Sequence, residues 1–134
     1  MFTGTFIATS TSARIRFSSA TDQSNKDWYI DGVSIVPIAG GTNTLINGNF
    51  ETGTSVGWQI LSCNSGCFAT ILASSTCLGG SGWCYNNACT PATNIQFIEQ
   101  YFATTNGAVY NVTYWLRKGG SGLGAGTGMY VNVF

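Results

Sequence analysis

The sequence predicts an all-β fold, a β-sandwich of eight or nine short antiparallel strands with a loop region stapled by disulfides. Short stretches alternate apolar and polar residues, and no window of about 11 residues or more carries the apolar stripe of a helix. Turn-forming residues recur about every 8–12 positions, as they do in β-sandwiches. Five cysteines fall within one stretch rich in Gly, Ser and Asn, where cross-links are most needed.

Three strands are expected in the first part of the chain. Residues 2–7 alternate imperfectly. Residues 12–17 alternate clearly, with Arg14 and Arg16 facing away from the apolar side chains that flank them. The third strand covers residues 28–36.

The third strand is interrupted by Asp31 and Gly32, and this pair predicts a bulge or bend. Residues 37–44 follow as a linker, because they combine a proline, glycines and polar residues. Beyond the linker, further strands are expected at residues 58–62, 67–73, 95–104, 108–117 and 129–134.

Two loops separate these later strands. The cysteine-rich residues 74–94 are predicted to be loop, and the glycine-rich residues 119–128 are predicted to be a flexible loop. Within residues 95–104, alternation places Gln100 on one face of the strand. We expect Glu99 to be exposed on the other face.

Composition excludes several classes of function. A chain of 134 residues forms one domain. Charged residues make up 7% of it, and five Lys and Arg balance five Asp and Glu, so no basic stripe exists to bind nucleic acid. Histidine is absent, which excludes Ser-His-Asp, Cys-His and His-zinc sites. No apolar stretch approaches the roughly 20 residues that membrane insertion requires.

The cysteines predict disulfides and an extracellular location. Their spacing lacks the paired C-x2-C knuckles of zinc ribbons, and a loop-rich segment gains most from covalent cross-links. Because the number is odd, one thiol is free, intermolecular or paired with a residue outside this chain. Two bridges among five cysteines allow fifteen arrangements, and the sequence does not select one. The five are Cys63, Cys67, Cys77, Cys84 and Cys89.

The N-terminal residues indicate a strand from the outset. They lack a basic region ahead of an apolar core, so they do not form a signal peptide. Since the cysteines indicate a secreted or cell-surface protein, we expect this chain to be a piece of a longer one.

Two pairs of segments resemble a known family. N-T-L-I-N-G-N-F-E-T-G-T-S-V-G-W at residues 43–58, followed by F-I-E-Q-Y-F-A-T-T-N-G-A-V-Y-N-V-T-Y-W-L at residues 97–116, resembles the opening half of jelly-roll carbohydrate-binding modules of the cellulose- and xylan-binding kind. Residues 2–17 and 24–35 are similar to the closing strands of the same module. The resemblance therefore implies a jelly-roll sandwich.

The two halves stand in reversed order. Residues 1–36 resemble the closing strands and residues 45–134 the opening strands, with residues 37–44 as the linker. This order fits either a cut through a tandem repeat or a circularly permuted module. In both cases the halves make one sandwich, within the chain or across neighbours.

Catalysis is not expected. The carboxylates show no acid and base pair placed across a bond, which a glycosidase requires. The family that the chain resembles is noncatalytic. The carboxylates are Asp22, Asp27, Asp31, Glu51 and Glu99.

The resemblance implies a possible structural calcium ion. Family members commonly hold calcium where the N-G-x-F-E strand meets a D-D-V strand, and oxygen ligands suit this cation. Here Glu51 and Asp31 keep their places, and Asn49 could donate its carbonyl oxygen. The D-D-V motif is reduced to Asp31-Gly32, so one ligand could be missing. The alternative is a turn Asp and a loop Glu with no ion.

A candidate sugar-binding face follows from alternation in residues 108–117. If Tyr110 and Val112 point inward, then Asn111, Thr113, Trp115 and Arg117 point outward. An outward Trp among polar groups suits sugar recognition, although a neighbouring subunit could instead cover it. Trp83 and Tyr85 could rim the same face or pack on the disulfides. Trp28 and Trp58 are expected in the core.

Asn111, Val112 and Thr113 also form an N-glycosylation sequon. A glycan on Asn111 would lie on the candidate sugar-binding face and would argue against ligand capture there.

Two functions follow as hypotheses. In the first, the module is an extracellular structural repeat that binds copies of itself head-to-tail in a filament, because the resemblance implies that one strand of the family is missing between residues 129–134 and residues 2–7. We then expect one of these two segments to form a strand in a neighbouring subunit. In the alternative, the module binds polysaccharide through its aromatic face.

Overall fold

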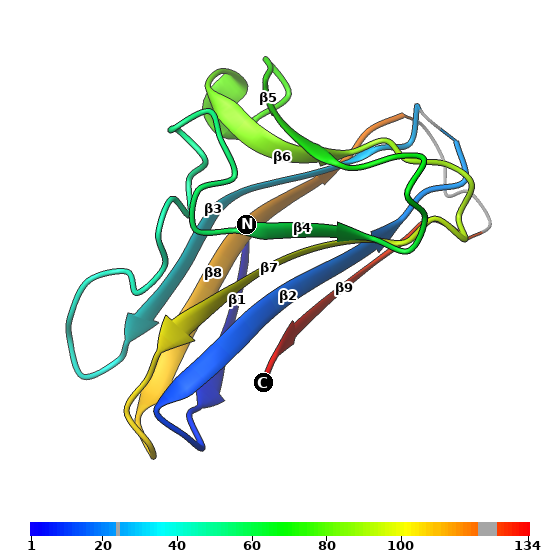
Figure 1. Cartoon of the computed structure of the whole chain (residues 1–134). Helices are drawn as coiled ribbons and strands as arrows, with labels where there is room; N and C mark the ends of the chain where they lie inside the picture. The colour runs from blue at the N-terminus through cyan, green and yellow to red at the C-terminus, as the bar shows by residue number, and fades with distance from the viewer. Residues whose placement is uncertain (24, 121–125) are drawn as a thin grey trace.

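The computed structural model describes residues 1–23, 25–120 and 126–134, and it is an all-β sandwich of two antiparallel sheets (Figure 1). The strand order is β1-β8-β3-β6-β5 in the five-stranded sheet and β4-β7-β2-β9 in the four-stranded sheet. The strands are β1 Phe2–Ile7, β2 Ser12–Ala20, β3 Trp28–Pro37, β4 Gln59–Ser62, β5 Thr70–Ala73, β6 Trp83–Asn87, β7 Gln96–Ala103, β8 Val109–Lys118 and β9 Gly128–Val133. A short 3₁₀ helix, η1, covers Leu78–Gly80.

The chain alternates between the two sheets along almost its whole length. Every connection except β5–β6 passes from one sheet to the other. Strands from the two ends of the chain alternate in space: β1 pairs with β8, β3 lies between β8 and β6, and β2 lies between β7 and β9. In the part of the chain that the structure describes, no helix is long and apolar enough to cross a membrane.

The predicted strands are confirmed, with one omission. Residues 74–94 were expected to be loop throughout, but β6 forms at Trp83–Asn87 between β3 and β5. The expectation is wrong here because four consecutive residues of β6 are buried, so the strand shows no alternation of apolar and polar residues. The predicted flexible loop at residues 119–128 lies in large part outside the described residues, since 121–125 are not described.

The predicted bulge in β3 is confirmed. The pairing of β3 with β8 shifts register between Asp31 and Ser34, and Gly32 has a φ of 55°. This left-handed conformation suits glycine, because a side chain there would meet its own backbone. A Cβ atom at Gly32 would also lie 3.0 Å from the side chain of Leu78.

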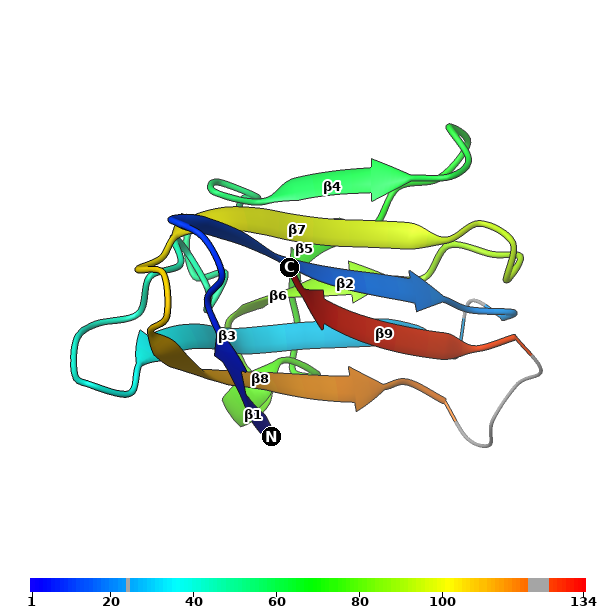
Figure 2. The same cartoon turned by 90° about the horizontal axis from the view of Figure 1, so that it is seen from below.

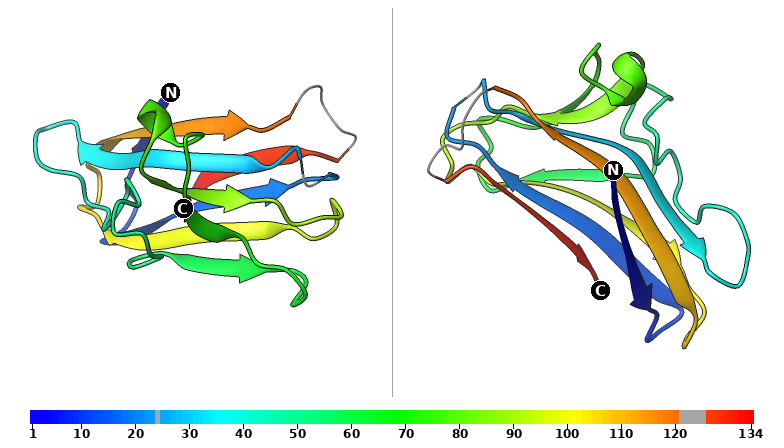
Figure 3. Two further views of the ribbon diagram at one scale, coloured as in Figure 1. Left: turned by 90° about the horizontal axis from the view of Figure 1, so that it is seen from above. Right: turned by 180° about the vertical axis from the view of Figure 1, so that it is seen from behind.

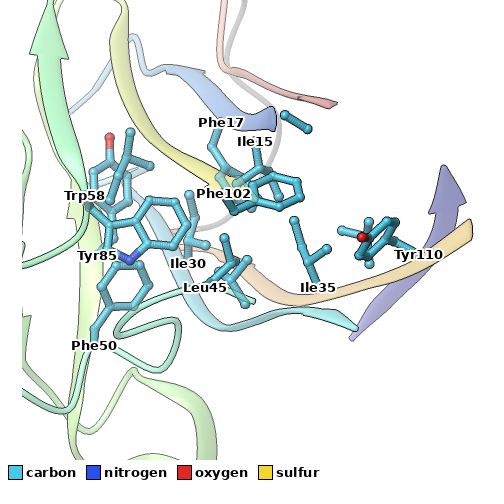
Figure 4. Close-up of a cluster of buried hydrophobic side chains, with 14 of the residues drawn as sticks. Ile15, Phe17, Ile30, Ile35, Leu45, Phe50, Trp58, Tyr85, Phe102 and Tyr110 are labelled. Atoms are coloured by element: carbon cyan, nitrogen blue, oxygen red, sulfur yellow. The ribbon is translucent and has the colours of Figure 1, made fainter. Parts of the chain in front are cut away.

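The core fills the space between the two sheets (Figure 4). Phe17 and Phe50 both pack on Trp58, with ring centroids 6.4 Å and 5.4 Å from its own. The Trp58 indole donates a hydrogen bond to the Asn47 carbonyl oxygen, so its one polar atom is satisfied. Trp58 is buried as expected, whereas Trp28, also expected in the core, is only half-buried at the start of β3.

Two disulfides form, and one thiol is free. Cys67 bonds Cys89, and Cys77 bonds Cys84, while Cys63 is an exposed free cysteine. The first bridge joins the loops on either side of the β5–β6 hairpin. The second holds the segment containing η1 against β6.

The two strands expected to exchange between subunits pair within their own chain. β1 pairs with β8, and β9 pairs with β2, each along one edge. Both are outermost strands on the same side of the sandwich, so each leaves its other edge unpaired (Figure 3, right).

Candidate functional site

The outward residues of β8 were predicted correctly. Tyr110 and Val112 are in the core, so the intervening side chains point away from it. We call this set the β8 face, and it lies beside β3 in the five-stranded sheet (Figure 3, left). It consists of Asn111, Thr113 and Trp115, which are half-buried, and Arg117, which is exposed.

A loop packs against the sheet next to the β8 face. Trp115 lies opposite Asp31 in the register of β3 and β8. The Asp31 carboxylate accepts hydrogen bonds from the backbone N–H groups of Gly32, at 2.6 Å, and of Leu78, at 3.1 Å. The second of these bonds brings η1 onto the outer surface of the sheet, where the Cys77–Cys84 disulfide holds it.

Trp83 and Tyr85 do not rim the β8 face. Tyr85 is fully buried in the core, because alternation along β6 turns it inward, and a buried ring offers no surface to a ligand. Burial also raises the pKa of the Tyr85 hydroxyl. The Trp83 ring lies against Gly53, where an added Cβ atom would be 3.1 Å from it.

The residues predicted to hold calcium lie in one region but are already engaged. Glu51 Oε1 accepts a hydrogen bond from the Trp83 N–H, and Asn49 Oδ1 accepts one from the Glu51 N–H. Burial raises the pKa of Asp31, and the negative charge of Glu51 raises it further, against the lowering effect of two backbone N–H groups. Among the described residues, no group of three or more His, Cys, Asp or Glu could hold a metal. Calcium binding stays a prediction.

The four-stranded sheet, which Figure 2 shows from its outer side, carries a second set of candidate residues on that face. Because Phe17 and Ile98 are buried in the core, the side chains between such positions point outward. We call this set the aromatic face. It consists of Arg14, Arg16 and Ser18 on β2; Gln59 and Leu61 on β4; Phe97, Glu99 and Tyr101 on β7; and Tyr130, Asn132 and Phe134 on or just after β9.

Strand register arranges the aromatic face in three rows. One row crosses the sheet through Tyr101, Arg14 and Phe134. The middle row is Gln59, Glu99, Arg16 and Asn132. The third row is Leu61, Phe97, Ser18 and Tyr130. The middle row is therefore entirely polar or charged, and the rings lie in the rows on both sides of it, together with Arg14 and Ser18.

The rings of the aromatic face are open to solvent. Tyr130 is 73% exposed, Tyr101 60% and Phe134 57%. Tyr130 and Phe134 are four residues apart along the chain, which corresponds to about 13 Å along an extended strand. The rings thus border a surface long enough for an extended ligand.

Charged groups occupy the centre of the aromatic face. Glu99 was expected to be exposed, but it is 3% exposed, because two arginines cover it. Arg16 Nε donates a hydrogen bond to Glu99 Oε2, and Arg14 Nη1 lies 3.5 Å from the same oxygen. Burial of a carboxylate requires such pairing.

Sequence reasoning missed the aromatic face, although the signal was present. The rule that pointed Trp115 outward also points Tyr101 and Tyr130 outward, because each follows a buried or half-buried neighbour in its strand. What the sequence did not reveal is that β7, β2 and β9 lie side by side. Without that order, the three exposed rings cannot be recognised as one surface.

A groove opens along the side of the sandwich where the two sheets part. It has a volume of about 370 Å³ and runs between the outermost strands β1 and β9. Its lining carries no charge and combines apolar side chains with two threonines: Phe2, Thr3, Gly4, Thr5, Phe6, Val112, Tyr114, Val131 and Val133.

Searches against protein-family models, curated proteins and solved structures found no match to this chain.

Proposed function

We propose that the chain is a noncatalytic, extracellular carbohydrate-binding module that holds polysaccharide on the aromatic face. The observation that carries this proposal is the set of three exposed rings beside polar groups on the outer surface of one sheet. The resemblance to jelly-roll carbohydrate-binding modules and the presence of two disulfides support it as well.

The chemistry of the face suits a sugar chain. A sugar ring presents apolar C–H groups on its faces and hydroxyl groups around its edge. Tyr130 and Phe134 offer apolar ring surface, and Asn132 and Gln59 offer donors and acceptors for hydroxyl groups. Burial of one exposed ring against a ligand contributes about 1–3 kcal/mol.

The β8 face supports binding less well. Trp115 is half-buried, and η1 is anchored on its neighbour Asp31. The sequon at Asn111 is on this face, so a glycan there would cover the five-stranded sheet and leave the aromatic face free. The two faces therefore have separate expected roles.

The test is retention on insoluble polysaccharide by paired variants. Tyr130→Ala should weaken retention on the order of tenfold, because it removes an exposed ring without touching the core. Trp115→Ala is the matched control and should change retention by less than about twofold. Loss of retention in Trp115→Ala alone would assign binding to the β8 face instead.

A second function, head-to-tail self-association into a filament, is favoured by the groove between β1 and β9. A strand of another copy could pair with the free edge of β1 or β9 and place apolar side chains in the groove. Such pairing would satisfy backbone groups that otherwise rely on water.

Sedimentation and negative-stain imaging test self-association. The wild-type chain should form oligomers. Phe2→Lys should dissociate them into monomers, because it places a charge in the lining of the groove. Ile38→Lys is the control, since Ile38 is exposed away from the groove. A wild-type chain that stays monomeric at high concentration would contradict this function.

A further inference from the structure

We propose that the polysaccharide is acidic, and that its carboxylate groups bind Arg14 and Arg16 at the centre of the aromatic face. The inference rests on the proposed function and adds the class of ligand. Its basis is the number of charges on this face, the hydrogen-bond donors that remain free, and the way the rings fix the two guanidinium groups.

The side chains of the aromatic face carry one unbalanced positive charge. Glu99 is its one carboxylate, and it is shared by Arg14 and Arg16. The other acidic residues are engaged elsewhere: Asp22 with Thr127, Asp27 with Asn86, Asp31 with Leu78 and Glu51 with Trp83. A chain with no net charge thus concentrates positive charge where its exposed rings lie.

The two guanidinium groups retain free donors. Both reach the same atom, Glu99 Oε2, and Arg14 Nη1 also donates to the Tyr101 hydroxyl at 3.2 Å. In the described part of the chain, the Arg16 Nη atoms and the Arg14 Nε and Nη2 atoms donate to no protein group. A planar guanidinium can donate two parallel hydrogen bonds to one carboxylate, which a neutral hydroxyl cannot accept.

The rings fix the arginines while leaving them accessible. The Arg14 guanidinium carbon lies 4.6 Å from the ring centre of Phe134 and 5.4 Å from that of Tyr101. Arg16 lies 5.2 Å from the ring centre of Phe97. The two arginine side chains remain 24% and 28% exposed. Side chains already held in place lose less conformational entropy when a ligand binds.

A uronate polysaccharide fits this face better than nucleic acid does. One surplus charge is far below the several phosphate contacts that a nucleic-acid interface makes. A sugar chain with carboxylates instead needs both ring surface and a local positive charge. The aromatic face provides both exposed rings and arginines, in adjacent rows of one sheet.

The test compares one sugar chain in two chemical forms. The probes are polygalacturonate oligomers with free carboxylates and the same oligomers as methyl esters, with a sulfated galactan and neutral xylan as two further arms. Calorimetry at low salt should show the free acid binding on the order of tenfold more tightly than the ester. Salt at about 0.5 M should remove most of the difference in affinity between the free acid and the ester.

Variants identify which arginine causes the preference for the free acid over the ester. Arg14→Gln should weaken binding of the free acid on the order of tenfold and so abolish its preference over the ester. Arg117→Gln removes the same charge from the opposite sheet and should keep the preference. Arg14→Lys retains the charge without the planar donors, so it should keep part of the preference. Far-UV circular dichroism checks that each variant folds.

The outcomes separate the inference from the proposed function. Equal binding of acid and ester, both weakened by Tyr130→Ala, would overturn the inference and leave the carbohydrate-binding function intact. The same holds for binding to neutral xylan alone, or for a preference for the sulfated galactan alone. No binding to any of these polysaccharides would contradict both. An equal loss of preference in Arg117→Gln would also overturn the inference.

Discussion

The outer surfaces of the two sheets differ in how far other parts of the chain cover them and in how far their aromatic rings are exposed. The β8 face lies next to a disulfide-held loop that binds Asp31 through its backbone, and its Trp115 is half-buried. The aromatic face has no such loop in the described residues, and Tyr130, Tyr101 and Phe134 are open to solvent. An outward position in a strand is therefore not enough to make a ligand site.

The difference has a simple physical origin. On the five-stranded sheet, Cys84 points outward and is fully buried by its bond to Cys77, which brings η1 with it. On the described part of the four-stranded sheet, Glu99 is the only buried outward side chain, and it is covered by the arginines of the neighbouring strand. One sheet is covered by a loop, and the other is covered only by its own side chains.

Release of the loop is the largest change expected. Cys77→Ser combined with Cys84→Ser should lower the free energy of unfolding by about 2 kcal/mol, as the entropy of a loop closed over seven residues implies. Hydrogen exchange at Leu78 should accelerate, because its bond to Asp31 depends on the loop. Retention on polysaccharide should be unchanged, measured on the same columns as the wild-type chain. Reduced retention would contradict the assignment of the ligand to the opposite sheet.

Removal of the central charge of the aromatic face should have a smaller effect. Glu99→Gln should lower the free energy of unfolding by about 1–2 kcal/mol, because a buried carboxylate that serves two arginines is replaced by a neutral group. It should also strengthen binding of acidic polysaccharide, since both guanidinium groups then lack a protein counterion. Urea unfolding and calorimetry measure the two effects, with the exposed Glu51→Gln as the control for carboxylate loss.

The smallest effect concerns the hydrogen bond that ties the start of β9 to the end of β2. The Thr127 hydroxyl donates to Asp22 Oδ1 at 2.6 Å and, more than any other group, lowers the pKa of Asp22. A carboxyl whose pKa is lowered by folding stabilises the fold above its unfolded pKa of 3.8, and that contribution is lost as the pH falls through the folded value.

Thr127→Val should therefore destabilise the chain slightly at neutral pH and have less effect in acid, below the pKa of Asp22. Urea unfolding across this pH range measures the difference between variant and wild type. A difference that grows in acid would show that the bond acts through something other than the charge of Asp22.

The sequence was informative where one face of a strand is polar and the other apolar. Residues 12–17 show this pattern, and β2 forms there with Arg14 and Arg16 outward. It was uninformative for β6, whose residues are buried on both faces, one by the core and one by η1. It was misleading for Glu99, because the arginines that bury it come from a strand more than eighty residues away in the chain.

A chemical-shift titration tests the central claim most directly. A short oligosaccharide of the best-bound polysaccharide is added to the isotopically labelled chain, and the backbone amide shifts are followed by NMR. We predict that the largest shifts occur at Arg14, Tyr101 and Tyr130, on three adjacent strands of the four-stranded sheet. Largest shifts at Asn111, Thr113 and Trp115 would place the ligand on the β8 face and contradict the account.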